Sequence, residues 1–119
     1  MTIEEALKRL SNSPFRASFS LKQEDLDYID RVGMETIRRH AEDFVRTRLA
    51  AADPPKDGNQ TPWKGHPVFV AQHATGCCCR GCLNKWYRVR KHVPLSEEQQ
   101  AKIVRLLMAW IEREYEEKR

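Results

Sequence analysis

The feature that most limits how this chain can fold is a dense group of histidines and cysteines near its centre. Two histidines, His66 and His73, precede four cysteines at positions 77, 78, 79 and 82, and the chain has no other cysteine. Free cysteines serve as metal ligands, as redox-active thiols or as small buried apolar groups. Three adjacent cysteines followed by a fourth favour metal binding over simple burial.

The length and the first residues indicate one domain in a reducing compartment. A chain of 119 residues fits a single domain, 1–119, that buries an apolar core without disulfides. The start, MTIEEALKRL, carries acidic side chains and no uninterrupted apolar stretch, so we expect neither a secretory signal nor a membrane span. A cytoplasmic location follows, and reduced thiols make a disulfide framework the least favoured interpretation.

Capping boxes and apolar spacing predict four amphipathic helices. The first ends before Pro14, so residues 1–14 form an N-terminal helix that can be loosely attached to the domain. Gly33 is placed to end the second helix, and the fourth carries the clearest apolar stripe of the chain. A further short helix is considered directly after the cysteines, over Arg80–Val89. The four predicted helices, with their N-caps, are 2–10, 20–33, 34–51 and 96–115.

Between the third helix and the cysteines lies a stretch that breaks regular structure. Residues 53–67 are rich in Pro, Gly, Asp and Asn and predict a long irregular loop, of a length that is often functional. Val68–Gln72 is the one strand-like run, and it predicts a small hairpin or ribbon. The expected fold class is therefore mainly α with a small β element (α+β), a helix-rich domain with a Cys/His metal-binding knuckle.

The spacing of the cysteines predicts a zinc site. Zinc prefers four tetrahedral nitrogen and sulfur ligands, and Cys79 and Cys82 have the two-residue separation that lets both reach one ion. Their position at the start of a helix would stabilise thiolates. Cys78 competes with Cys79, and three cysteines with one histidine is an alternative site. Iron is a less favoured metal for the same ligand types. The first-choice set is His66, His73, Cys79 and Cys82, with Cys78 and His40 as further candidates.

The basic residues are concentrated in the same half of the chain. No acidic residue occurs between Asp57 and Glu97, although the net charge is only +4. Such a block attracts nucleic acid or another anionic ligand, and a solvated basic surface is the alternative interpretation. A nucleic-acid-binding module would also use Trp63, Trp86 or Tyr87 for stacking. The basic side chains proposed for contact are Arg80, Lys85, Arg88, Arg90 and Lys91.

An enzymatic alternative comes from a partial match to zinc deaminases. Their signature combines a histidine, a catalytic glutamate and two cysteines, for which this chain offers His40, Glu42, Cys79 and Cys82. In that case the histidine and the cysteines would bind zinc and Glu42 would shuttle protons to a metal-activated water. The proline before the first cysteine and the surrounding strands are missing from the pattern.

Segments along nearly the whole chain resemble the bacterial and phage family called domain of unknown function 4186. The resemblance is carried by FRASFSLKQEDLDYI, GMETIRRHAEDFVRTRLA, TPWKGHPVFVAQHAT, CCRGCLNKW and MAWI. It supplies no function. In the family a histidine commonly follows the Lys-Trp pair where this chain has Tyr87, and Cys77 is an addition, so neither is expected to be an essential ligand. The resemblance implies one common site that includes His40, His66, His73, Cys78, Cys79 and Cys82.

Overall fold

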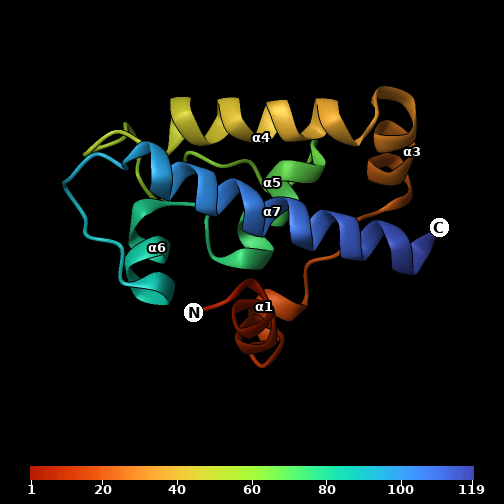
Figure 1. Ribbon diagram of the computed structural model, residues 1–119, viewed down its shortest axis with the longest axis horizontal. Helices are drawn as coiled ribbons and strands as arrows, with labels where there is room; N and C mark the ends of the chain where they lie inside the picture. Colours follow the sequence, from red (N-terminus) through yellow and green to blue (C-terminus); the bar gives the residue numbers. More distant parts are fainter.

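The computed structural model describes residues 1–119 as seven α-helices joined by loops (Figure 1). No residue forms a strand, so the expected small β element and the α+β class are wrong. The helix-rich single domain is confirmed, because one apolar cluster draws side chains from six of the seven helices. The helices are α1 Ile3–Ser11, α2 Pro14–Ala17, α3 Gln23–Val32, α4 Met34–Arg48, α5 Pro67–Thr75, α6 Arg80–Tyr87 and α7 Glu97–Lys118.

The longest helix, α7, runs through the middle of the molecule and packs against α4 and α5 (Figure 1). Its capping box is confirmed: the Gln99 backbone N–H donates to Ser96 Oγ at 3.0 Å, and the Ser96 N–H donates to Gln99 Oε1 at 2.9 Å. Burial of one large aliphatic side chain contributes about 1.5–3 kcal/mol, so the apolar strip of α7 is a major part of the core. The strip consists of Ile103, Val104, Leu106, Leu107, Met108 and Ile111.

Helix α1 packs onto the domain beside α2, α5 and α7. The predicted capping box is present, since the Glu5 N–H donates to Thr2 Oγ1 and the Thr2 N–H donates to Glu5 Oε1, each at 3.1 Å. Three side chains of α1 reach the interior, namely Ala6, Leu7 and Leu10.

Two details at the N-terminal side of the fold differ from expectation. A short helix, α2, follows α1, with Pro14 in its first turn and the Arg16 N–H donating to Ser13 Oγ at 3.3 Å. Helix α3 begins at Gln23, and the Lys22 N–H donates to the Asp25 carboxylate at 3.0 Å where a Ser20–Gln23 box was expected. Gly33, with φ +88°, ends α3 as predicted.

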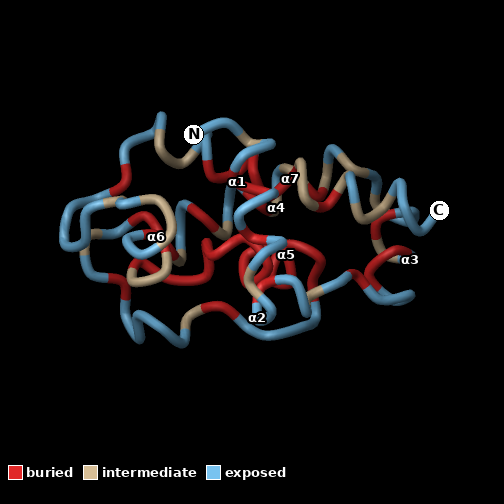
Figure 2. The backbone as a smooth tube through the Cα atoms, turned by 90° about the horizontal axis from the view of Figure 1, so that it is seen from below, coloured by how far each residue is buried: buried red, intermediate tan, exposed pale blue.

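The predicted strand Val68–Gln72 is part of α5, and every residue of α5 is buried (Figure 2). A short, continuous apolar run is typical both of a buried strand and of a buried helix, so its periodicity could not separate the two. The helix is specified at its ends. Pro67 occupies the first turn, and Gly76 adopts the left-handed conformation with φ +72° at the C-terminal cap. Helix α5 thus forms a buried rod that ends directly before the cysteines.

Helix α6 begins at Arg80, as considered from the sequence, and a buried arginine fixes it in place. Arg80 is 1 % exposed, and its guanidinium donates to the backbone carbonyls of Ala51, Arg90 and Val93. These bonds hold the loop after α4 and the loop between α6 and α7 against the start of α6. None of the seven helices combines the length and the apolar composition of a membrane span.

Candidate metal centre

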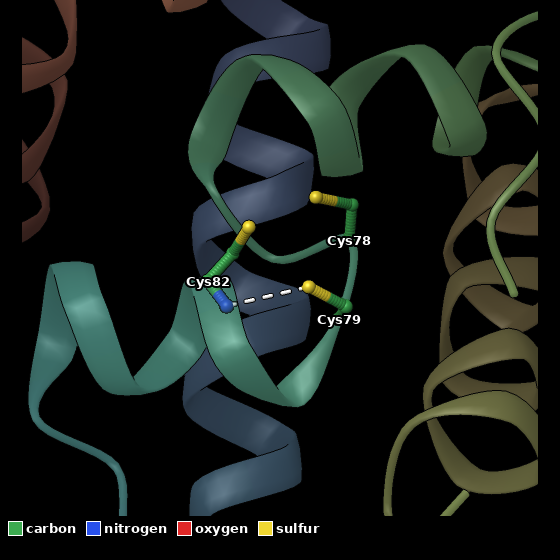
Figure 3. A group of neighbouring side chains, drawn as sticks. All are labelled: Cys78, Cys79 and Cys82. Atoms are coloured by element: carbon green, nitrogen blue, oxygen red, sulfur yellow. Dashed lines mark hydrogen bonds between the residues drawn. The ribbon is translucent and has the colours of Figure 1, made fainter. Parts of the chain in front are cut away.

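Three cysteine side chains converge where the chain passes from α5 into α6 (Figure 3). The Sγ atoms of Cys78, Cys79 and Cys82 all lie within 4.8 Å of one another. Cys79 is the N-cap of α6, and its Sγ accepts a hydrogen bond from the Cys82 backbone N–H at 3.3 Å. The reversal of the chain at Gly76 brings Cys78 to the same point. Three sulfurs in this arrangement could hold a metal ion.

The guanidinium of Arg16, from α2, lies against the sulfurs. Its Nη2 donates to Cys82 Sγ at 3.3 Å, and its Nη1 contacts Cys78 Sγ at 3.7 Å. Nη1 also donates to the backbone carbonyl of His73 at 2.6 Å. Because Arg16 is only 7 % exposed, its positive charge acts on the sulfurs with little screening by water. Thiolates are the sulfur species that such a charge favours.

The three thiols differ in their acidity. The hydrogen bond from the Cys78 thiol is the largest of the causes that lower the pKa of Cys82 to about 5, and the Cys79 thiol and Arg16 act in the same direction. The same bond and burial raise the pKa of Cys78, and burial raises the pKa of Cys79. Cys82 is therefore the thiolate that would accept a metal first, and the charge of the ion would favour deprotonation of the other two.

His73 is oriented as a nitrogen donor. Its Nε2 lies 3.1 Å from the Thr61 carbonyl oxygen and 3.0 Å from that of Pro62. Carbonyl oxygens only accept, so Nε2 carries the ring proton and Nδ1 keeps a free lone pair. Nδ1 is buried and has no hydrogen-bond partner. A backbone carbonyl that holds the second ring nitrogen is the common arrangement behind a metal-ligating histidine.

Burial also keeps the His73 ring in its neutral form. It lowers the pKa of His73, while the nearby Cys82 thiolate acts in the opposite direction. Neutral imidazole is the form that binds metals. His73 therefore lies within electrostatic range of Cys82 and has its unprotonated nitrogen unused.

His66 and His40 form a separate pair. His40 Nδ1 and His66 Nε2 are 2.9 Å apart, and the Val68 N–H donates to His66 Nδ1 at 3.0 Å. Both nitrogens of His66 are thus engaged. The group of ligand atoms within 4.8 Å of one another holds the three sulfurs alone, and neither this pair nor His73 is part of it. Aromatic rings enclose the pair, with the centroids of Tyr28, Phe44 and Phe69 at 5.4, 5.1 and 5.6 Å from that of His66.

The remaining candidates lie apart from the three sulfurs. Cys77 is fully buried outside the group, and burial raises its pKa to about 12. Glu42 is exposed on α4, so the structure does not assemble the deaminase pattern. Of the basic side chains proposed for nucleic-acid contact, Arg80 is buried, and the exposed ones are Lys85, Arg88, Arg90 and Lys91.

Sequence reasoning missed Arg16. The pair Ser13-Pro14 is an N-cap followed by proline, which could have predicted a helix start and hence α2. Nothing local indicates that this arginine meets cysteines more than sixty positions later in the chain.

The chain matches the family described as Domain of unknown function (DUF4186) over residues 4–112. This match covers most of its length, so the chain belongs to that family. No solved structure matches the chain.

Proposed function

We propose that this member of the DUF4186 family is a small intracellular protein whose fold is stabilised by one zinc ion, bound by Cys78, Cys79, Cys82 and His73. The observation that carries the proposal is the convergence of three sulfurs. His73 lies close by, because Arg16 contacts its carbonyl as well as Cys78 and Cys82, and its buried Nδ1 has no hydrogen-bond partner. A neutral imidazole lone pair and three thiolates form a complete tetrahedral ligand set for zinc.

The hydrogen bonds favour His73 over His66 as the nitrogen ligand. To bind a metal through Nε2, His66 would have to move its proton to Nδ1, where the Val68 N–H already donates. His73 needs no such change, because its proton already faces two carbonyl oxygens. The proposed set therefore replaces His66 by Cys78.

The proposed site is structural rather than catalytic. Four protein ligands leave no open position for a water or a substrate, which a catalytic zinc requires. Cys78 and Cys79 are each 8 % exposed, and the ligands join α5 to the start of α6. The cytoplasm is the compartment that suits the site, because its thiols stay reduced.

Elemental analysis of the protein purified under reducing conditions tests the proposal. We expect about one zinc per chain from the single ligand set. Replacement of zinc by cobalt should produce sulfur-to-metal charge-transfer absorbance together with the visible bands of a tetrahedral ion. A colourless, metal-free protein that is fully folded would refute the proposal. Stoichiometric iron with its own visible absorbance would instead support the iron alternative.

A further inference from the structure

Aromatic and cationic side chains form a ridge beside the candidate metal centre, linked beneath the surface by the buried Arg16. The ring centroids of Trp63 and Phe15 are 6.4 Å apart, and the Arg16 guanidinium carbon lies 5.0 Å from the Phe15 ring. That carbon is also 5.9 Å from the Trp86 ring, over which the guanidinium of Arg9 lies at 5.5 Å. The fold assembles this ridge from α1, α2, α6 and the loop before α5.

The two aromatic residues at one end of the ridge are exposed but firmly held. Trp63 is 62 % exposed and Phe15 is 52 % exposed. The Trp63 indole stacks on the His73 ring with a centroid distance of 4.0 Å and an interplanar angle of 11°, and it lies nearly parallel to Phe19. Exposed flat rings that are already ordered lose little conformational entropy when a planar ligand stacks on them.

Exposed basic residues adjoin both tryptophans of the ridge in the sequence. Lys64 follows Trp63, Lys85 precedes Trp86, and both lysines are exposed. Arg9 is also exposed, and it donates to the Trp86 carbonyl at 3.2 Å. Both tryptophans come from the interval between Asp57 and Glu97, which contains no acidic residue. Their neighbours in the sequence therefore carry no carboxylate that would repel an anion. Flat rings interleaved with cations match a ligand that carries both bases and phosphates.

We propose that this ridge binds single-stranded nucleic acid, with bases stacked on Trp63 and Phe15 and phosphates held by Lys64, Lys85 and Arg9. A single strand is the fitting form, because its bases present free faces, whereas those of a duplex are stacked on each other. The inference goes beyond the zinc proposal and has an independent test, since the aromatic and cation–π partners of Phe15 are Phe19, Trp63 and Arg16, none of which is a proposed ligand.

Fluorescence anisotropy with labelled oligothymidine and oligouridine tests the stacking part. We expect Trp63→Ala and Phe15→Ala each to weaken binding about tenfold, the effect of one lost base–aromatic stack. Val93→Ala removes an exposed apolar side chain outside the ridge and should leave the affinity unchanged. Zinc content and melting temperature are measured for each variant. If Trp63→Ala loses zinc, the affinity of Phe15→Ala alone decides the stacking part of the proposal.

Salt titration tests the cationic part. The double variant Lys64→Ala/Lys85→Ala should reduce the slope of log affinity against log salt by about 1.4, because each lost phosphate contact on a single strand removes about 0.7. The matched control Lys102→Ala/Arg113→Ala removes two exposed charges of α7 and should not change the slope. Binding of either probe supports the proposal, and the tighter one shows which of the two strands the ridge prefers. Absence of binding at low salt, unchanged affinity of both aromatic variants, or equal binding of duplex would overturn it.

Discussion

At the scale of single residues, hydrogen bonds assign different roles to the two histidines of the central segment. His73 keeps a free nitrogen and His66 does not. We expect His73→Asn to lose zinc, because an amide is a poor substitute for the imidazole lone pair. His66→Asn should retain it, since asparagine can still accept from the Val68 N–H as an N-cap. Zinc per chain, measured after gel filtration, checks the pair, and retention by His73→Asn would contradict the assignment.

The cysteines give a second residue-scale prediction. We expect Cys78→Ser, Cys79→Ser and Cys82→Ser each to lose most of the zinc, because each removes one of three thiolates. Cys77→Ser is the matched control within the same run and should keep the metal, since its Sγ lies outside the group. Equal metal loss in all four variants would show that folding, not ligation, is what the substitutions disturb.

Acid stability follows from the environment of His66. Burial, together with the charge of His40, lowers the pKa of His66 from 6.5 to about 4. The folded state therefore resists protonation, so the stability from neutral His66 is complete above about pH 6.5 and is lost as the pH falls toward 4. His40 from α4 and Tyr28 from α3 are the titratable groups that face it.

Melting temperatures of native protein and His66→Asn, measured across this pH range, test the expectation. The native protein should lose stability more steeply, because the variant has no group to protonate at this position. Metal release in acid affects both proteins alike, so the difference between the slopes isolates His66. Parallel slopes would exclude a contribution from this ring.

The sequence indicated the converging sulfurs more directly than it could rank the histidines. Two-residue spacing next to a helix start identified Cys79 and Cys82 from local information alone. The choice between His66 and His73 depends on which backbone groups meet each ring, and those of Thr61 and Pro62 come from an irregular loop. Such contacts carry no spacing signal, and neither does the approach of Arg16 from α2.

At the scale of elements, the turn between α5 and α6 is tightly constrained at Gly76. Gly76 has φ +72°, and a Cβ at this position would lie 2.7 Å from Trp86 Cδ1. Gly76→Ala must therefore both strain the backbone and displace the indole. Gly58 has φ +102° with open space around it, so Gly58→Ala suffers the strain alone.

We expect Gly76→Ala to lower the melting temperature clearly more than Gly58→Ala. The strain common to both is about 1–2 kcal/mol, and each kcal/mol corresponds to about 4 °C in a chain of this size. Thermal unfolding followed by circular dichroism measures the difference. Equal shifts in melting temperature would mean that the Trp86 indole moves away from the added Cβ at no cost in stability.

The helices were predictable where their ends carry signals. The caps at Thr2 and Ser96 and the stop at Gly33 are all local, and the structure confirms them. The apolar run of α5 has no polar face, because the helix is buried on all sides, and its type is decided by the neighbours that enclose it. Burial on all sides thus removed the amphipathic period that would have identified α5 as a helix.

At the scale of the whole molecule, the proposed zinc ion would join the end of α5 to the start of α6, two helices that also contribute to the apolar core. Metal-coupled folding of small sites contributes on the order of 10 kcal/mol, comparable with the entire stability of a domain, about 5–15 kcal/mol. We expect a strong chelator to lower the melting temperature by about 10 °C or more. Differential scanning calorimetry with and without chelator checks this.

Cys82→Ser serves as the control for chelation. This variant should have a lower melting temperature than the native protein. The chelator should not lower it further, because the variant lacks the complete ligand set. An unchanged melting temperature of the native protein, once elemental analysis shows that the zinc is gone, would contradict a stabilising role for the metal.

The central position of α7 also affects how the protein can be made. Helices α4 and α5 have α7 as their main partner, yet it is the last of the seven to leave the ribosome. At about 5–20 residues per second, the segment from Cys82 to the end of α7 takes a few seconds to synthesise. During this interval the main helical partner of α4 and α5 is incomplete, so the apolar core cannot form in full. The surroundings of the candidate metal centre therefore depend on an element that is made late, because α5, which leads into the cysteines, packs against α7.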